Sequence, residues 1–487
     1  MIFSKFTFNS KLPKYKQLEK FIINNINKEN LIYGNKLPST RELSKLLKVS
    51  RNLIVSVYEN LESAGYLEIR NGSGTFVILN RVRKKNNISE NILWESYINK
   101  SGKMARELDI VKTQYKWEKG MIAFKSIAPD ENLFDLKGFK RAFLDMFSIE
   151  GNKILNYGYA KGYQKLIDWL KEYMKCKGVN TDGKDILITN GFTEGFNLVT
   201  DTIINKKDGV LVEEPTHNTA LKILKLNEVE LISITMDKDG INYDILKKKI
   251  LEKKPKFIYI TPSYHNPTGI VMSAERRSMV YKILRDNNII IIEDGFNEEL
   301  LYLNSHLLPL SSYSNRNDFI YIGSFSKILY PGLRIGWILA DNKLIDTLES
   351  VKRTKTIHCS TLDQAILYYY LNGGDFEKYI KKVRKYYADK YRLIVEFINK
   401  YINYEEISGE GGLHVFIKLK KNYSVKKIID ECYKKGVIFM PGSVFYKKGD
   451  DDSTIRLGFS KLTDKEIEKG IKVIGEVIYL QNIDNNK

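Results

Sequence analysis

The sequence predicts an α/β protein with two folded parts of unequal size, and three observations support this prediction. Residues 14–78 contain three helical patterns followed by two strands around a glycine-rich turn. After residue 121, short apolar segments alternate with helical stretches, which is typical of a doubly wound, mainly parallel sheet. From about residue 346, long helices lead into the strand-like segments "GGLHVFIKL" and "STIRLGFS", which favour a small α+β subdomain.

The helices of the N-terminal part are predicted from apolar spacing and capping. "YKQLEKFIINNI" has apolar residues at helical spacing. "STRELSKLLKVS" begins with Ser39 and has Glu42 three residues later, the capping-box pattern, and it places Leu43, Leu46 and Leu47 on one face. A third helix, "RNLIVSVYENLESAGY", precedes "YLEIRNGSGTFVIL", which alternates like the two strands of a hairpin. This order of elements is the plan of a winged helix-turn-helix domain.

The segment "LPSTRELSKLLKVSRNLIVSVYENLESAGYLEIRNGSGTFV" resembles the GntR-type winged helix of bacterial regulators. The resemblance implies that "SRNLIVSVYENL" is the recognition helix, whose N-terminal residues enter the major groove of DNA. Arg51 and Arg41 are then expected to contact DNA, and Asn52 is expected to read a base edge. Gly72 at the tip of the wing would let the backbone approach the minor groove, with Arg70 beside it.

The positive charge of the chain is concentrated near its N-terminus. The formal net charge is +19, and residues 1–120 carry 22 Lys and Arg against 11 Asp and Glu. This concentration indicates binding to a polyanion, although the whole chain is rich in Lys, Asn, Ile and Tyr, which is an alternative reason for its charge. We expect a cytoplasmic bacterial protein without membrane contact, because no apolar run is long enough for a span and no secretory signal is visible. The three cysteines lie far apart in the sequence and predict no metal site.

The sequence pattern changes near residues 80, 121 and 346. "NRVRKKNNISEN" is basic and rich in Asn, and the residues after it have only weak helical periodicity. We therefore expect four segments: a winged helix-turn-helix DNA-binding domain at 1–79, a basic and partly helical linker at 80–120, a large domain at 121–345 and a small C-terminal subdomain at 346–487.

Polar residues follow several of the apolar segments in the large domain. "ITNGFTEGF" places Phe192 and Thr193 where a strand ends and a helix opens, so their backbone N–H groups can bind a phosphate. "YHNPTG", "IIEDGF" and "GSFSK" place Asn266, Asp294 and Lys327 after three further strands. Because ligands of open α/β sheets bind at the carboxyl ends of the strands, we expect these residues to share one site.

These motifs, with "SFSK" followed by "LRIG", resemble the fold-type I pyridoxal-phosphate (PLP) enzymes of the aspartate aminotransferase superfamily over about residues 120–480. The resemblance implies that Lys327 forms a Schiff base with PLP, that Asp294 pairs with the pyridine nitrogen and that Asn266 donates to the phenolic oxygen. The residues that it implies for the phosphate are Ser324, Arg334 and the amides around Phe192 and Thr193.

Two further residues follow from the same resemblance. Tyr157 in "LNYGYAKG" is similar to the tyrosine that reaches the phosphate of a partner subunit, which implies a homodimer. Arg456 in "IRLGF" is similar to the arginine that binds the α-carboxylate of a substrate or effector.

Two positions depart from the family pattern. Phe296 stands where related fused proteins have a tyrosine that bonds the phenolic oxygen, so the phenolate is expected to be less stabilised. His217 stands where an aromatic residue, mostly tyrosine, stacks on the cofactor ring, and a histidine ring can also stack. These departures weaken the expectation of full catalytic power more than that of cofactor binding.

A winged helix joined to an aminotransferase-like domain resembles the MocR/PdxR group of bacterial regulators. The resemblance implies a transcriptional regulator that senses PLP, or an amine or amino-acid ligand, through an aldimine at Lys327. The alternative is an active PLP-dependent aminotransferase that carries a DNA-binding domain, because Lys327, Asp294 and Arg456 are all present. A third hypothesis is a cofactor-free scaffold that uses the fold only for dimerisation.

Overall fold

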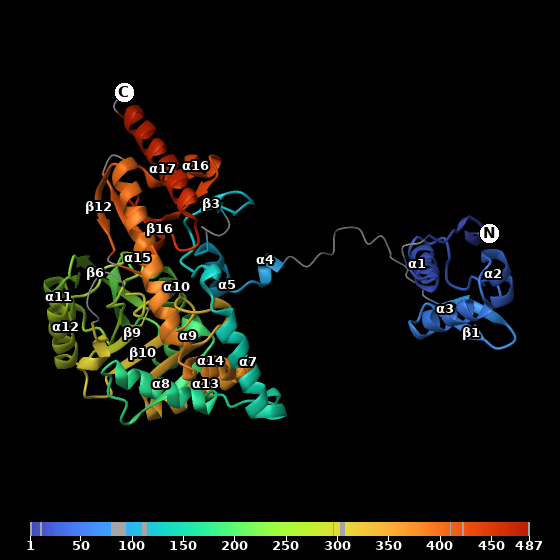
Figure 1. Ribbon diagram of the computed structural model, residues 1–487, viewed down its shortest axis with the longest axis horizontal. Helices are drawn as coiled ribbons and strands as arrows, with labels where there is room; N and C mark the ends of the chain where they lie inside the picture. Colours follow the sequence, from blue (N-terminus) through green and yellow to red (C-terminus); the bar gives the residue numbers. More distant parts are fainter. Residues whose placement is uncertain are drawn as a thin grey trace. The chain divides into compact units, whose positions relative to one another are not determined.

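A computed structural model of the chain describes residues 2–9, 12–78, 94–109, 114–295, 297–301, 307–409, 411–420 and 423–485. The chain divides into two compact units, residues 1–98 and residues 99–487 (Figure 1). Among the described helices, none combines the length and the apolar character that a membrane crossing requires.

The first unit is a winged helix-turn-helix domain, as predicted. Its elements are η1 (Ile2–Lys5), α1 (Lys14–Asn27), α2 (Thr40–Leu47), α3 (Arg51–Ser63) and the antiparallel strands β1 (Leu67–Arg70) and β2 (Gly74–Val77). The capping box is present, because Ser39 Oγ accepts from the Glu42 N–H and a Glu42 carboxylate oxygen accepts from the Ser39 N–H. Of the three leucines that the sequence places on one face of α2, Leu43 is buried, whereas Leu46 is 42 % exposed. Leu47 packs partly against the core of this unit, so the core covers only part of the face.

The predicted linker is described only in part. It contains the short helices α4 (Trp94–Tyr97) and α5 (Lys100–Glu107). The helix α5 belongs to the second unit, where it packs against α10 (Asn218–Leu226), and Lys222 Nζ lies 2.9 Å from Asp109 Oδ1. The residues 79–93 and 110–113 lie outside the described residues.

The second unit is built on an eight-stranded sheet of order β4-β11-β10-β9-β8-β5-β6-β7. The strands from β10 to β6 run parallel, β11 runs antiparallel to both of its neighbours, and β7 runs antiparallel to β6. This is the mainly parallel sheet that the sequence predicts. The bounds of its strands are β4 (Lys184–Thr189), β5 (Gly209–Glu214), β6 (Glu230–Asp237), β7 (Gly240–Ile241), β8 (Phe257–Ile260), β9 (Ile290–Asp294), β10 (Phe319–Ser324) and β11 (Gly336–Asp341).

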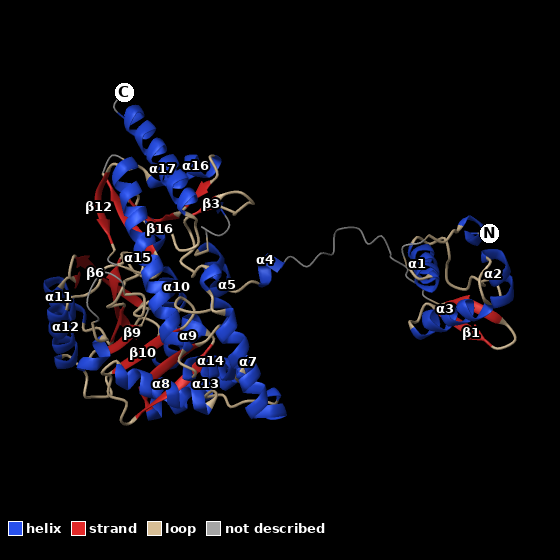
Figure 2. Ribbon diagram, in the orientation of Figure 1, coloured by secondary structure: helices blue, strands red, loops and turns tan. Residues whose placement is uncertain are grey.

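Helices cover both faces of this sheet (Figure 2). Alternate strand residues enter opposite cores: Ile258 and Ile260 pack in one, and Phe257 and Tyr259 pack in the other, as the two-residue period of a strand requires. The second of these cores also contains residues of α9 (Gly191–Ile203), α10 and α13 (Asn342–Thr356). The other helices of this part are α7 (Leu136–Glu150), α8 (Gln164–Cys176), α11 (Tyr243–Lys253), α12 (Ala274–Asp286) and α14 (Thr361–Asn372), with the short 3-10 helices η3 (Glu131–Leu133), η4 (Gly151–Leu155), η5 (Leu310–Tyr313) and η6 (Pro331–Leu333).

The C-terminal part is α+β, as predicted. An antiparallel sheet of order β12-β13-β16-β15 packs with three helices, and β3 (Ile122–Ala123) pairs in parallel with β14 (Val437–Ile438). Residues 122 and 123, at the start of the range predicted as the large domain, therefore belong to the C-terminal part. Strands can pair whatever their separation along the chain. The remaining elements are α15 (Asp375–Tyr401), β12 (Tyr404–Ser408), β13 (His414–Leu419), α16 (Val425–Lys434), β15 (Met440–Pro441), η7 (Gly442–Phe445), β16 (Thr454–Gly458) and α17 (Asp464–Asn485).

Candidate functional site

The polar residues that the sequence places after separate strands lie at the carboxyl edge of the parallel sheet. Lys327 follows β10, Asp294 is the last residue of β9, and Asn266 lies in the loop after β8. Arg456 on β16 reaches this edge from the C-terminal part, where its Nη1 donates to Asn266 Oδ1 at 2.8 Å. The edge thus gathers residues from both parts of the second unit.

Lys327 is held in a largely buried position among other positive charges. Burial is the main cause that lowers the pKa of its amine to about 8, and Arg456, Arg334 and Lys461 lower it further. An amine with this pKa is neutral in about a tenth of the molecules at pH 7 and in about half at pH 8, far more than an ordinary lysine, and only the neutral amine is a nucleophile. The environment therefore suits a lysine that attacks a carbonyl group.

Asp294 is a buried carboxyl group with little compensating positive charge. Burial raises its pKa to about 7, nearby carboxylates add to the effect, and the hydrogen bond from Tyr259 OH, at 2.7 Å, opposes it. His217 Nδ1 lies 3.8 Å from the same carboxylate oxygen. A buried acid of this kind is suited to a cationic ring nitrogen, which would supply the missing charge.

His217 precedes α10 and packs against aromatic rings. The centre of its ring lies 5.2 Å from that of Phe192. Burial, with the charges of Arg456 and Lys327, lowers the pKa of His217 to about 3, so the ring is neutral near pH 7. A neutral, flat ring at this place can stack on another ring, as expected for this position.

A small cradle for an anion lies where β4 meets α9. Arg334 Nη2 donates to Asn190 O at 3.0 Å, and its Nη1 donates to Ser326 Oγ at 3.2 Å. The Ser326 N–H donates to Ser324 Oγ, also at 3.2 Å. Gly191 has a φ of +77°, and a Cβ atom there would lie 2.9 Å from Arg334 Nη2. The cradle therefore requires glycine.

The cradle also includes the start of α9. Phe192 and Thr193 lie in the first turn of this 13-residue helix, where backbone N–H groups have no partner within the helix. The positive end of the helix and the Arg334 guanidinium together fit a phosphate. The residues present thus fit the phosphate end of PLP, and Lys327, Asp294 and Asn266 fit its other end.

Arg456 is buried and has no carboxylate partner among the described residues. Its Nη2 donates to Lys125 O at 3.2 Å, its Nε has no hydrogen-bond partner, and burial lowers its pKa to about 9. The bond from Arg456 to Asn266 Oδ1 orients the Asn266 side-chain amide, so that its NH₂ group faces away from the guanidinium. A buried guanidinium without a counter-ion is suited to bind a carboxylate from a ligand.

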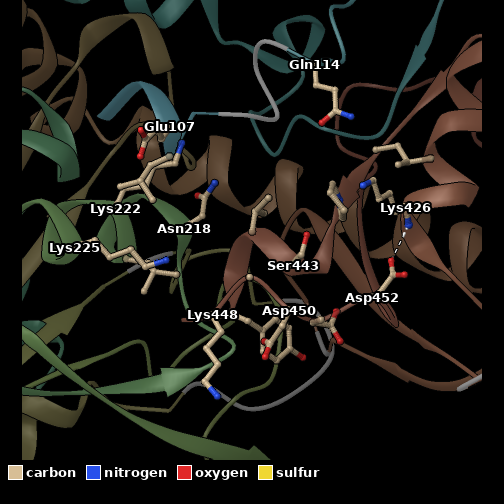
Figure 3. A pocket seen from close by; sticks show the side chains of 18 of the residues that line it. Glu107, Gln114, Asn218, Lys222, Lys225, Lys426, Ser443, Lys448, Asp450 and Asp452 are labelled. Carbon is tan, nitrogen blue, oxygen red and sulfur yellow. Dashed lines mark hydrogen bonds between the residues drawn. The ribbon is translucent and has the colours of Figure 1, made fainter. Parts of the chain in front are cut away.

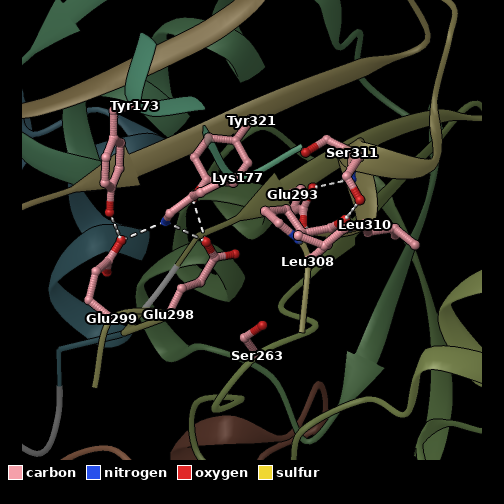
Figure 4. Close-up of polar contacts among 12 residues, drawn as sticks. Tyr173, Lys177, Ser263, Glu293, Glu298, Glu299, Leu308, Leu310, Ser311 and Tyr321 are labelled. Carbon is pink, nitrogen blue, oxygen red and sulfur yellow. Dashed lines mark hydrogen bonds and ion pairs between the residues drawn. The ribbon is translucent and has the colours of Figure 1, made fainter. Parts of the chain in front are cut away.

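A buried polar network holds Glu293, which precedes Asp294 in the sequence, and the pair Glu298 and Glu299, which follows it (Figure 4). On one side, Glu293 accepts from the backbone N–H groups of Leu310 and Ser311, each at 2.7 Å. On the other side, Lys177 Nζ lies 2.8 Å from a Glu298 oxygen and 2.5 Å from a Glu299 oxygen. These bonds fix the segment that presents the Asp294 carboxylate.

The other predicted residues of this site stand apart from it or lie outside the described residues. Tyr157 is 85 % exposed, and its ring packs edge-on against His358 with 5.9 Å between the ring centres. An exposed tyrosine is available to another copy of the chain, which is the role expected for it. Phe296 lies outside the described residues.

The residues predicted to bind DNA lie on the surface of the first unit. Arg41 on α2 and Arg51 and Asn52 at the start of α3 are exposed, and Arg51 Nε donates to Thr40 Oγ1 at 3.3 Å. Gly72 has a φ of +75° in the turn between β1 and β2. Arg70 is less available than expected.

The Arg70 guanidinium forms an ion pair with Glu68 at 2.8 Å and lies 4.9 Å from the centre of the Phe76 ring. A contact with DNA at the wing would therefore have to compete with Glu68.

Sequence reasoning missed three residues that shape the site. Tyr259 donates to Asp294 from the middle of an apolar strand, and Ser326 and Asn190 accept from Arg334. The only signal for Tyr259 is a hydroxyl in the apolar strand "KFIYITP". Ser326 lies inside the motif "SFSK" and could have been found from it.

Comparison with known proteins identifies the two units. Residues 14–77 match the family described as bacterial regulatory proteins, gntR family, and residues 127–474 match aminotransferase class I and II. The second match covers more than half of the chain. The chain belongs to the aminotransferase class I and II family.

Its relatives include both enzymes and regulators. An aromatic-amino-acid aminotransferase of Thermococcus litoralis is 32 % identical over 66 % of this chain and 80 % of its own length. YdfD of Bacillus subtilis, which is named an uncharacterized HTH-type transcriptional regulator, is 27 % identical over 96 % of this chain and 97 % of its own length. The regulator NorG of Staphylococcus aureus is 27 % identical over 90 % of this chain and 98 % of its own.

Solved structures agree on the fold of the second unit. A multiple substrate aminotransferase from Thermococcus profundus has a TM-score of 0.76 at 27 % identity and covers 81 % of this chain and 100 % of its own. A kynurenine aminotransferase from Pyrococcus horikoshii, in complex with PMP, has a TM-score of 0.74 at 29 % identity. The match covers 80 % of this chain and 98 % of that one. The fold is therefore that of a fold-type I aminotransferase preceded by a GntR domain, and it implies PLP as the cofactor and DNA as a partner.

Proposed function

We propose that this protein is a DNA-binding transcriptional regulator whose aminotransferase-like unit binds PLP and responds to an amine or amino acid, or to PLP itself. The observation that most supports an amino-acid effector is the buried Arg456, which has no carboxylate partner among the described residues. The alignment with regulators over nearly the whole chain supports regulation.

Each residue of the site has a role in this proposal. Lys327 would hold PLP covalently, Asp294 would pair with its ring nitrogen, and Asn266 would donate to its phenolic oxygen. The phosphate would lie in the cradle formed by Ser324, Ser326, Arg334 and the first turn of α9, and His217 would stack on the ring. When bound, PLP supplies an electron sink beside a bound amine.

The effector would act through thermodynamic linkage. A ligand that binds one conformation of the second unit more tightly than another shifts the population toward that conformation. We propose that this shift repositions the winged helices of a homodimer on DNA. A coupling free energy of about 1–3 kcal/mol would change the affinity for the operator about 5- to 150-fold.

The homodimer is proposed from the exposed apolar surface of α7 and η4. Leu144, Ile149, Leu155 and Tyr157 are each at least 64 % exposed. Large apolar side chains that are this exposed in one short segment of a folded chain are candidates for an interface. We propose that this surface binds a second copy and that Tyr157 reaches the phosphate cradle of that copy.

The experiment that tests the proposal is a gel shift with DNA from upstream of the protein's own gene. Binding is measured with and without PLP and with a panel of amino acids and amines. We expect at least one of these compounds to change the affinity 5-fold or more. In an Arg456→Leu chain, the response to amino acids should be lost while basal DNA binding remains.

The matched control is Arg392→Leu on the exposed face of α15, which should behave as the unmodified chain. An effector response that persists in Arg456→Leu would contradict the role of Arg456. An affinity that no compound changes would contradict sensing.

The second candidate function is that of an active aminotransferase with a fused DNA-binding unit. It is favoured by the presence of Lys327, Asp294, Asn266 and Arg456 at one sheet edge and by the enzymes among the relatives. Steady turnover of an amino donor and an oxo acid, unchanged after deletion of residues 1–98, would support the enzyme over the regulator.

A further inference from the structure

A second cavity lies away from the cofactor site, between α5, α10, α16 and the segment 441–452 (Figure 3). Its volume is about 550 Å³, which lies within the range of small-molecule sites. None of the residues that line it belongs to the site around Lys327. The cavity is therefore a separate place where a ligand could bind.

One wall of the cavity is formed by two lysines of α10. Lys222 and Lys225 lie three residues apart, so they are on the same face of the helix. The Lys222 ammonium is occupied, because it pairs with Asp109 at 2.9 Å. Lys225 forms no ion pair with the described residues, and burial together with the neighbouring Lys447 lowers its pKa. Lys225 is thus a half-buried cation that lacks a counter-ion.

Two of the four carboxylates in the lining, Asp451 and Asp452, are bound within their own part of the chain and form no ion pair with Lys225. Asp451 accepts from the Thr454 N–H at 3.0 Å and from the Ser453 hydroxyl at 2.8 Å. Asp452 accepts from the Ser424 hydroxyl at 2.6 Å and from the Lys426 N–H at 2.8 Å, and this last bond is drawn in Figure 3. These carboxylates hold their own loop in place.

The rest of the lining has an apolar part, the uncharged polar residues Gln114, Asn218 and Ser443, and exposed charged groups. The charged groups are Glu107, Lys426, Lys448 and Asp450. The apolar residues are Leu108, Tyr115, Leu221, Ile429, Pro441 and Val444. A ligand that fits these surfaces needs one anionic group and an apolar body.

We propose that this cavity binds a small organic anion, a carboxylate or a phosphate monoester, whose charged group pairs with Lys225 and whose body packs between Tyr115, Leu221 and Ile429. This site is separate from the effector site of the proposed function and does not depend on it. The ligand would contact α5 and Tyr115, which lie in the predicted linker. It would also contact α10, whose N-terminus follows His217 in the cofactor site.

The test is calorimetric titration of the full-length, PLP-loaded chain with benzoate, phenyl phosphate and inorganic phosphate. We expect at least one of the two organic probes to bind at one site. Whichever of benzoate and phenyl phosphate binds more tightly shows whether the site prefers a carboxylate or a phosphate ester. We expect Lys225→Gln to weaken that binding 10-fold or more, and inorganic phosphate to bind at least 10-fold more weakly than the organic probe. The matched control is Lys282→Gln on the exposed face of α12, which should bind as the unmodified chain.

Two results would overturn the proposal. One is the absence of binding by both organic probes at about 10 mM, and the other is unchanged binding in Lys225→Gln. An Arg456→Leu chain separates this site from the cofactor site, because binding in the second cavity should persist there. Binding that is lost in Arg456→Leu and kept in Lys225→Gln would place the probe at the cofactor site and would also overturn the proposal.

A second measurement is made on the unmodified chain, so it does not depend on whether a variant folds. The rate at which an amine-acylating reagent modifies Lys225 is followed by mass spectrometry, with Lys282 as the internal reference. The bound probe should slow the modification of Lys225 at least 3-fold and leave that of Lys282 unchanged. Equal rates with and without a probe that binds by calorimetry would contradict a contact with Lys225.

Discussion

The chemistry of the site depends on two buried groups, Lys327 and Asp294, whose charged forms are both disfavoured by burial. The pKa of the lysine is lowered to about 8, and that of the aspartate is raised to about 7. Each group lacks the opposite charge that would compensate burial in the free chain. A cationic ring nitrogen beside Asp294 would supply it, so the site is arranged for a ligand rather than for its own stability.

The first prediction at the residue scale concerns stability and pH. The pKa of Asp294 is raised from 3.8 to about 7 on folding, so between these values the folded chain binds more protons than the unfolded chain. The free energy of unfolding must then fall as the pH rises through this window. The destabilisation by the ionised Asp294 carboxylate is complete above pH 7. We expect Asp294→Asn to stabilise the cofactor-free chain by about 1–3 kcal/mol at pH 8 and by much less at pH 4.

Thermal unfolding of the cofactor-free chain at both pH values measures this effect. The control is Asp182→Asn, an exposed aspartate. Equal effects of Asp294→Asn at pH 4 and pH 8 would contradict a raised pKa. The same variant should release PLP more readily in dialysis, because the charge that pairs with the ring nitrogen is gone.

The second prediction concerns the positive charges around Lys327. Arg456 is the largest contribution after burial to the lowered pKa of the Lys327 amine. Removing it in Arg456→Leu should raise this pKa, so that a smaller fraction of the amine is neutral at pH 7. We expect PLP to attach to the cofactor-free chain about 3- to 10-fold more slowly at pH 7, with the difference vanishing at high pH.

The attachment is followed by the absorbance of the bound cofactor. Arg392→Leu, in which an exposed arginine is removed, should leave the rate unchanged. Lys327→Ala should abolish the band altogether, and a band that persists in this variant would be evidence against Lys327 as the attachment point.

At the scale of elements, the phosphate cradle depends on how β4 passes into α9. Gly191 has a positive φ, and the guanidinium of Arg334 occupies the space that a side chain would need. We expect Gly191→Ala to weaken PLP binding 10-fold or more, because the new methyl group displaces Arg334. The matched control is Gly436→Ala, since Gly436 has the same φ of +77° but no atom within 4 Å of a built Cβ.

Equilibrium dialysis with PLP measures this difference. The control should show the same backbone cost in thermal stability, about 1 kcal/mol, with normal PLP binding. Equal PLP binding by the two variants would show that the cradle does not hold the phosphate.

The start of α3 is the corresponding element of the first unit. Arg51 is exposed at the first helical position, and Ser50 caps the helix by accepting from the Leu53 N–H at 3.3 Å. We expect Arg51→Ala to weaken operator binding by about 1–3 kcal/mol if the side chain contacts a base. Lys20→Ala, on the exposed face of α1, is the control in a gel shift at physiological salt, and equal affinities of the two variants would rule out the contact.

At the scale of the whole molecule, the two units have separate hydrophobic cores. The core of the winged helix contains only residues from the first 77, and the cores of the second unit begin at Tyr115. We expect a chain of residues 99–487 to fold, to bind PLP within 2-fold of the full chain and to lose operator binding. Circular dichroism, dialysis and gel shift measure the three properties, and a fragment that unfolds would show that the units depend on each other.

Much of the fold follows from local patterns in the sequence. The capping box at Ser39, the apolar periodicity of α1 and the strand–helix alternation after residue 121 each depend on neighbours in the chain, and the structure has each of them. The motifs after the strands also indicated a shared edge for Asn266, Asp294 and Lys327. The exposure of Leu46 could not be predicted, because helical spacing identifies the face that Leu46 shares with Leu43 but not how much of that face a small core can cover.

The sequence by itself determined the class of both units and the residue types of the cofactor site, since these depend on spacing and on short motifs. Only the tertiary structure decided which distant groups meet. It brought Tyr259 to Asp294, Arg456 to Asn266, Ile122 to Val437 and α5 to α10. Such contacts depend on strand order and on the packing of helices over a sheet, which link residues without regard to their separation along the chain. The same packing leaves Lys225 facing a cavity without a partner among the described residues, which no local pattern indicates.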